Sequence, residues 1–176
     1  MTGMSSDALT DLALRAQAGD RVALSDFVRA TQDDVWRVCA HLTSPAQADD
    51  VVQDVYLRAL RALPRFRGDS SARTWLLAIA RNTAIDSVRA AVRRRRLLHR
   101  TPATEDAPDA AGGTDLTALV ATLDPDRRSA FVLTQVVGCS YEEAAEICSC
   151  PVGTIRSRVA RARADLVDAL RRAEAT

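Results

Sequence analysis

Arginine side chains gather in a short stretch near the carboxyl end of the chain, in a pattern suited to contacting nucleic acid. Residues 151–163 contain four Arg and no acidic residue. At about 100° per residue, one helical face would carry Ile155, Val159, Ala162 and Leu166, and the opposite face Gly153, Ser157, Ala160 and Ala164. Small residues flanked by the guanidinium forks of Arg156 and Arg161 let a helix enter the major groove and reach base edges. Thr154 and Arg158 fall near the edge of the packed face, where they are placed to contact phosphates.

The residues before this stretch predict a second, shorter helix. Ser140 followed by Glu143 forms a capping box, so a helix should begin at Tyr141 and end near Cys148. Pro151 suits the first position of the next helix. Two helices joined by so short a turn, the second rich in Arg, form a helix-turn-helix. For an Arg-rich helix considered alone, a plain solvated face is the alternative.

Cys148 and Cys150 are the one close pair among the four cysteines of the chain. They lie one residue apart, with no second pair and no nearby His, which makes an incomplete metal site. We therefore expect no metal and no cofactor, and we interpret the pair as small core residues. A disulfide framework is not expected in a reducing compartment.

A polar stripe runs along the predicted helix 45–63. Its members are Asp50, Gln53, Asp54, Leu57 and Arg61, whereas the inward stripe is formed by Val52, Val55, Tyr56, Ala59 and Leu63. A polar face that holds one apolar anchor suits a protein partner. A plain solvated face is an equally good interpretation of this pattern alone.

The loop after that helix, together with the next helix, is the most basic part of the chain. The polar residues that end the loop and open the helix are Arg67, Asp69, Ser70, Ser71 and Arg73. Such a loop could hold an extruded base, and Ser70 or Ser71 can cap the following helix. We expect Phe66 in the core rather than stacked on a base. The helix ends in the run Arg93, Arg94, Arg95 and Arg96, after Arg81 and Arg89; this like-charge density favours a neighbouring polyanion or, alternatively, a solubilising tail.

The elements that must position these residues are all helical. With 47% hydrophobic and 4% aromatic residues, the 176-residue chain can bury a core but does not resemble a β-sandwich or an aromatic-rich binder of single strands. The apolar period is near 3.6 throughout. The expected helices are 7–18, 21–42, 45–63, 72–97, 116–123, 126–137, 141–148 and 151–172. We predict an all-α fold of two small helical domains, 7–98 and 116–172, joined by a flexible linker at 99–115, where Pro and Gly replace large apolar residues.

Charge is distributed unevenly along the chain, although the formal net charge is only +1. Residues 64–98 have nine Arg against two Asp, a net charge of +7, whereas residues 116–150 have two Arg against five acids, a net charge of −3. We therefore hypothesise that the two domains dock weakly on each other when DNA is absent. The chain also lacks an apolar run of about 18 residues and a secretory leader, so we expect a cytoplasmic protein without membrane insertion.

Three segments together give the chain a family resemblance. They are Ala48-Asp-Asp-Val-Val-Gln-Asp-Val-Tyr-Leu-Arg-Ala59, the stretch 66–86 with its Thr74-Trp-Leu-Leu-Ala-Ile-Ala-Arg-Asn82 core, and Cys150-Pro-Val-Gly-Thr-Ile-Arg-Ser-Arg-Val-Ala-Arg-Ala-Arg163. In this order, divided by a linker, they resemble the extracytoplasmic-function (ECF) class of bacterial RNA polymerase sigma factors. The chain is most similar to the SigC-like group of actinobacteria.

The resemblance implies partners and a role for each surface. The protein would bind core RNA polymerase, recognise promoter −35 and −10 elements and open the DNA, with no catalytic residues of its own. The stripe from Asp50 to Arg61 would bind the β′ clamp helices, and the second domain the β flap. The −10 contacts would come from Arg67, Asp69, Ser70, Ser71, Arg73, Asn82, Arg89 and Arg93. The −35 contacts would come from Ser140, Tyr141, Thr154, Arg156, Ser157, Arg158, Ala160 and Arg161. An anti-sigma factor is a further partner that the class allows, and the free protein would be a monomer.

Two other functions fit part of the pattern. A stand-alone helix-turn-helix regulator with a helical effector domain would use the same carboxy-terminal helices, but it leaves the polar loop at 66–71 unexplained. A thiol or metal enzyme built on Cys148 and Cys150 lacks a companion base, a phosphate-binding loop and a carboxylate pair. A regulator should bind duplex DNA tightly by itself, whereas a sigma factor should need core polymerase for specific binding.

Overall fold

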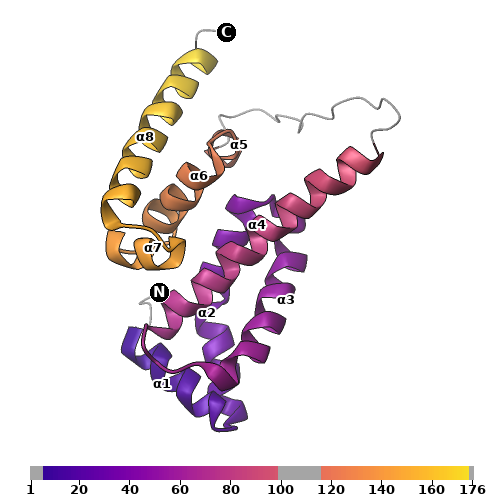
Figure 1. The fold of residues 1–176 in the computed structure, drawn as a ribbon, viewed down its shortest axis with the longest axis vertical. Helices are drawn as coiled ribbons and strands as arrows, with labels where there is room; N and C mark the ends of the chain where they lie inside the picture. The colour runs from indigo at the N-terminus through magenta and orange to yellow at the C-terminus, as the bar shows by residue number, and fades with distance from the viewer. Residues whose placement is uncertain (1–5, 99–115, 175–176) are drawn as a thin grey trace.

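The amphipathic runs of the first half of the chain form a domain of packed helices (Figure 1). The structure, a computed structural model, describes residues 6–98 and 116–174, so the predicted linker 99–115 lies outside the described residues. In this domain the helices are α1 (Ser6–Gln17), α2 (Arg21–Leu42), α3 (Pro45–Ala62) and α4 (Ala72–Leu98), with a 3₁₀ turn (Leu63–Arg65) after α3. Side chains such as Val35, Val38, Val55, Leu76 and Leu77 are buried between them.

Local signals in the sequence explain where these helices begin. The Asp20 carboxylate accepts hydrogen bonds from the backbone N–H groups of Val22 and Ala23, which caps α2. Proline at the first position of α3 needs no N–H partner. Ser71, one of the two predicted caps of α4, accepts a hydrogen bond from the Thr74 N–H at 3.1 Å. These caps hold the polar loop at 66–71 between two rigid elements.

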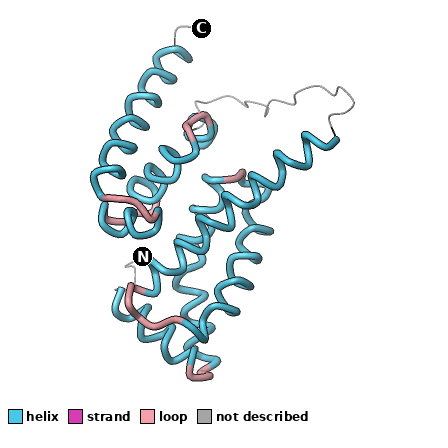
Figure 2. Tube along the Cα trace, in the orientation of Figure 1, coloured by secondary structure: helices cyan, strands magenta, loops and turns pink. Residues whose placement is uncertain are grey.

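The second domain consists of α5 (Leu116–Ala121), α6 (Pro125–Phe131), a π-helical turn (Val132–Val136), α7 (Tyr141–Cys148) and α8 (Val152–Glu174). Every element that the structure describes is helical, which confirms the predicted all-α class with two helical domains; Figure 2 shows the short loops that join the helices within each domain.

The predicted single helix 126–137 is wrong in two details. The helix begins earlier, at Pro125, because Asp124 caps it by accepting from the N–H groups of Asp126 and Arg127. It also widens into the π-helical turn, where Val137 N–H donates to the Val132 carbonyl at 3.0 Å. The wider turn begins at the buried Val132. The helical stretch ends before Gly138, which adopts a φ of +77°.

The two domains contact each other through two helices of the first domain, α4 and α2. α7 packs against α4, and the π-helical turn, α5 and α6 lie against α2. α8 runs along the outer side of the second domain, and in Figure 1 it lies on the opposite side of the molecule from α3. α4 and α2 are therefore the helices of the first domain that the second domain covers in part.

Candidate nucleic-acid interface

The predicted helix-turn-helix is formed by α7 and α8. The Ser140 hydroxyl accepts from the Glu143 N–H at 3.0 Å, and the Glu143 carboxylate accepts from the Ser140 N–H at 2.7 Å, which completes the capping box. Ser149 then takes a left-handed conformation with φ of +51°, so the chain reverses within a few residues. α8 begins at Val152 rather than at Pro151, whose carbonyl accepts the first hydrogen bond of the new helix from Thr154 N–H at 2.9 Å.

The faces of α8 match the prediction from helical spacing. Ile155, Val159, Ala162 and Leu166 are buried, and Gly153, Ser157, Ala160 and Ala164 are exposed. Arg156 and Arg161 are exposed on either side of the small residues, and no described residue forms an ion pair with them. The helix thus presents a shallow surface with two free guanidinium groups, a shape that fits the major groove of DNA.

Arg158 differs from these two arginines because it is tied to its own domain. Its guanidinium forms an ion pair with Asp126 of α6 and lies 3.7 Å from the Cys150 sulfur. Thr154 is half-buried, and its carbonyl accepts from the Ser157 hydroxyl at 2.9 Å. Asp126 was not predicted from the sequence, since nothing local relates a residue of α6 to a residue of α8.

The polar stripe on α3 is open to solvent. Asp50, Gln53, Asp54 and Arg61 are exposed, and 52% of the Leu57 side chain is accessible. The inward stripe packs as predicted, with Val55, Ala59 and Leu63 buried and Tyr56 half-buried. An exposed leucine among charged side chains is an apolar anchor available to a protein partner.

Residues 68–71 of the loop form one wall of a hollow of about 430 Å³. The other wall comes from Asp7, Thr10, Asp11 and Leu14 of α1, which the sequence analysis missed because no local signal links α1 to this loop. Arg67 pairs with Asp69 at 2.9 Å, and both side chains are exposed. Phe66 is buried and its ring centroid lies 5.0 Å from that of Trp75, so Phe66 is a core residue as expected.

Arg73 does not point into this hollow. Its guanidinium pairs with Asp34 of α2 at 2.7 Å and donates to the Val137 carbonyl of the second domain at 2.9 Å. It also lies 3.6 Å from the sulfur of Cys139. Burial raises the pKa of Cys139 to about 11, so this group is a neutral thiol near pH 7. Arg73 is thus a bridge between the two domains.

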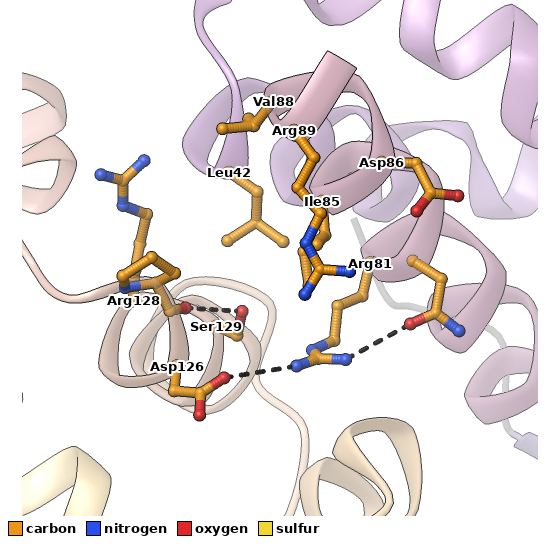
Figure 3. Close-up of a pocket in the computed structure, with 11 residues that line it drawn as sticks. Leu42, Arg81, Ile85, Asp86, Val88, Arg89, Asp126, Arg128 and Ser129 are labelled. Carbon is orange, nitrogen blue, oxygen red and sulfur yellow. Dashed lines mark hydrogen bonds and ion pairs between the residues drawn. The ribbon is translucent and has the colours of Figure 1, made fainter. Parts of the chain in front are cut away.

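Asn82 and Arg89 line a second cavity, of about 370 Å³, between α4 and α6 (Figure 3). Arg81, their neighbour on α4, reaches across it toward Asp126 at 3.8 Å. Arg93, nearer the end of α4, is exposed. Three of the predicted −10 residues, Arg73, Asn82 and Arg89, therefore face the second domain, whereas Arg67 and Arg93 do not contact it.

Comparisons with known proteins match both domains. Residues 27–96 match the family model of sigma-70 region 2, and residues 114–166 match that of sigma-70 region 4. The chain is 51% identical over 172 residues to the ECF RNA polymerase sigma factor SigC of Mycobacterium tuberculosis (strain CDC 1551 / Oshkosh), covering 93% of this chain and 92% of that protein. It is 37% identical over 183 residues to the ECF RNA polymerase sigma-E factor of Escherichia coli (strain K12), covering 90% and 93%.

Solved structures show the same architecture. CnrH in complex with the cytosolic domain of CnrY superimposes with a TM-score of 0.74 at 30% identity, covering 93% of this chain and 97% of that chain. The sigma factor RpoE in complex with the anti-sigma factor NepR from Bartonella quintana has a TM-score of 0.67 at 32% identity, covering 83% and 97%.

The chain combines a helix-turn-helix that has an exposed basic face with a helical domain that has an exposed acidic stripe. This combination is typical of a DNA-binding transcription factor. More particularly, the chain belongs to the ECF class of RNA polymerase sigma factors of the sigma-70 type, and it shares about half of its residues with SigC of M. tuberculosis. It therefore acts in transcription initiation, with core RNA polymerase and promoter DNA as its partners. None of its described helices is long and apolar enough to cross a membrane.

Proposed function

We propose that this ECF sigma factor divides promoter recognition between residues 7–98 and residues 116–172, and that it promotes DNA opening in the cytoplasm without catalysis of its own. Extruding a base costs a few kcal/mol, about the free energy that a fitted protein surface can return. Binding alone can therefore drive opening. The observation that best supports this proposal is the open face of α8, which offers Arg156 and Arg161 beside small residues.

The −35 element would be contacted by α8 and by the start of α7. Arg156 and Arg161 would donate to base edges, while Ser157 and Ala160 allow close approach. Thr154 and Arg158 would contact phosphates, and Ser140 and Tyr141 would contact the backbone from the amino end of α7, where the helix dipole favours negative charge. Arg158 would have to share its guanidinium between Asp126 and the DNA.

The −10 element would be held by the loop at 66–71 and by α4. The hollow lined by Asp69, Ser70 and Ser71 has room for an unstacked base, and Arg67 is exposed in the same loop. The exposed Arg93, near the end of α4, would hold phosphates. Asn82, Arg89 and Arg73 would join these contacts once the second domain moves away, because in the present arrangement they face α6 and the π-helical turn.

Core polymerase would bind the exposed stripe of α3, with Leu57 as the apolar anchor among Asp50, Gln53, Asp54 and Arg61. The β′ clamp helices are the expected partner there, and the β flap is the expected partner of the second domain. An anti-sigma factor is a further proposed partner, since the related RpoE of Bartonella quintana is found in complex with the anti-sigma factor NepR.

The arrangement of the two domains would keep the free factor inactive. The domain contacts cover part of α4, and the bridge of Arg73 to Val137 joins them. This agrees with the hypothesis of docking between segments of opposite charge. Cross-linking and small-angle scattering of the free protein at physiological salt test it: two independently tumbling domains would contradict the idea.

Run-off transcription with purified core polymerase is the test of the proposed function. The template is the DNA upstream of the gene of this protein, with a random-sequence pool beside it. We expect specific transcripts that disappear with Arg156→Ala and with Asn82→Ala. Arg171→Ala removes another arginine and Gln32→Ala another side-chain amide, both at exposed positions outside the two proposed surfaces, and they should leave transcription unchanged. Tight duplex binding by the protein alone, without a polymerase-dependent product, would favour the regulator instead.

A further inference from the structure

The cavity between α4 and α6 has the size and the position of a ligand site. Its volume of about 370 Å³ falls in the range of small-molecule pockets, about 300–1,000 Å³. Its lining comes from both domains, with Leu42, the face of α4 from Arg81 to Arg89, and the first turn of α6 from Pro125 to Ser129. Any molecule that fills it would touch both domains at once.

The charges that line this cavity are unbalanced. Three guanidinium groups line it, those of Arg81, Arg89 and Arg128; Figure 3 shows Arg81 and Arg89 extending from α4 toward α6. The cavity has two carboxylates, but each is paired with an arginine outside it. Asp86 lies 3.1 Å from Arg58, and Asp126 pairs more closely with Arg158 than with Arg81. The cavity therefore keeps an excess of positive charge.

Two of the arginines also present buried donors without partners. The Nε atoms of Arg81 and Arg128 are buried, and neither has a hydrogen-bond partner among the described residues. Only 13% of the Arg81 side chain is exposed. Burial lowers the pKa of Arg128, the direction expected for a guanidinium without a compensating anion. Charged donors left unpaired in a protein interior are costly, and an oxyanion would satisfy them.

The remaining lining is apolar and narrows the class of ligand. Leu42, Ile85, Val88 and Pro125 provide surface on which a flat ring can lie, beside the arginines that suit phosphate oxygens. We propose that this cavity binds a small molecule of the nucleoside diphosphate class and that the bound molecule holds the two domains together. This inference rests on the proposed function, because Asn82 and Arg89 would serve the ligand in one state and the −10 element in the other.

Thermodynamic linkage gives the regulatory consequence. A ligand whose site requires both domains binds the closed arrangement and not the open one, so it shifts the population toward closure. Promoter opening, which needs Asn82 and Arg89 free, would then become weaker as the ligand concentration rises. No residue of α3 lines the cavity, so the contact of polymerase with the exposed stripe of α3 should not itself depend on the ligand.

The test uses the full-length protein with ADP, GDP and pyrophosphate as probes, each titrated by calorimetry. We expect a nucleoside diphosphate to bind, and we expect pyrophosphate to bind more weakly because it lacks the ring. Arg81→Met and Arg128→Met remove one guanidinium from each domain, and each should weaken binding by about tenfold or more. Arg127→Met is the matched control, since Arg127 is the neighbour of Arg128 but pairs with Asp165 outside the cavity.

Run-off transcription with and without the nucleoside diphosphate completes the test. We expect the ligand to reduce transcription by the wild type and not by Arg128→Met, whose transcription without ligand should equal that of the wild type. If the wild type transcribes but binds none of the probes, or if Arg127→Met loses as much affinity as Arg128→Met, the ligand site is refuted. If pyrophosphate binds as tightly as the nucleoside diphosphates, the proposed contact between the apolar lining and a nucleoside ring is refuted. A wild type that fails to transcribe with core polymerase would instead refute the proposed function.

Discussion

A substitution can remove the hydrogen bond from Arg73 to the second domain and keep the packing of the Arg73 side-chain stem. In Arg73→Met the apolar stem remains, and the guanidinium that donates to the Val137 carbonyl at 2.9 Å is lost. The ion pair of Arg73 with Asp34 lies inside the first domain, so its loss affects the closed and open arrangements equally. Only the contacts across the interface change the equilibrium between the two arrangements.

The size of the change follows from the kind of contact. A hydrogen bond from a charged donor contributes about 1.5–3 kcal/mol where it is well shielded. The Arg73 side chain is 19% exposed, so water replaces part of the contact and the lower value applies. About 1.4 kcal/mol corresponds to a tenfold change in an equilibrium constant. We therefore expect the open population to rise about tenfold in Arg73→Met.

Labelling of Cys139 by a small thiol reagent measures this population. Cys139 is 5% exposed and its sulfur lies 3.6 Å from Arg73, so we expect it to react through the open arrangement. Where reclosing is faster than labelling, the rate follows the open population. Peptide mass spectrometry separates Cys139 from Cys39, which is buried in α2 of the first domain and should react at an unchanged rate. Arg67→Met, at an exposed arginine of the neighbouring loop, is the control.

Two results would refute this reasoning. An unchanged rate at Cys139 would mean that the Arg73 bridge does not hold the domains together. A rise at Cys39 equal to the rise at Cys139 would mean that the protein unfolds as a whole, so the faster labelling would not report the separation of the domains. Either result would remove the structural basis for the proposed inactive state.

Four further changes test single features of the fold and the site. Ser140→Ala removes the capping box of α7, and thermal denaturation should show a loss of about 0.5–2 kcal/mol. Gly138→Ala introduces a Cβ at φ +77° with no atom within 4 Å, so the loss of about 1–2 kcal/mol seen in denaturant unfolding should come from backbone strain alone. Burial raises the pKa of Cys39 to about 12 from 9.0, so the thiol ionises more easily in the unfolded chain than in the folded protein. The stability that depends on the neutral thiol is present below pH 9 and is lost as the pH rises toward 12. The free energy of unfolding, measured from about pH 8 to pH 10, should therefore fall more steeply for the wild type than for Cys39→Ala. Arg156→Ala should relax the preference at one −35 base pair by about 1–3 kcal/mol in competition binding with the holoenzyme, whereas Arg94→Ala should weaken binding uniformly and reduce the salt dependence.

Periodic and local features of this chain were predictable from sequence. The buried face of α8 follows from the spacing of Ile155 and Val159, and the start of α7 follows from Ser140 and Glu143. Both depend on residues within two helical turns of each other. The π-helical turn after α6 was not predictable, because the apolar spacing of residues 126–137 fits one continuous α-helix as well.

The sequence predicted that the two domains would attract each other, but not which residues would make the contacts between them. The opposite net charges of 64–98 and 116–150 predicted docking, and the domains do contact each other. The contacts themselves are different from simple charge pairing. Arg73 donates to a backbone carbonyl, which carries no sequence signal, and Arg81 reaches Asp126 only at 3.8 Å. The functional residues assigned to α4 were expected to be free for DNA, and no pattern within α4 tells that Asn82 faces α6.

The closed arrangement also implies an order of events at a promoter. The stripe of α3 and the small-residue face of α8 are both exposed while the domains are docked. The two helices themselves lie on opposite sides of the molecule (Figure 1). On the proposed function, polymerase and the −35 element would bind without separating the domains. Asn82 and Arg89, which line the cavity against α6, would complete their contacts with the −10 element only after α6 moves away. If polymerase holds the two domains apart when it binds both, the free energy of polymerase binding drives the exposure of the −10 surface. Opening of the DNA would then be coupled to assembly of the holoenzyme, and the free factor alone would not open DNA.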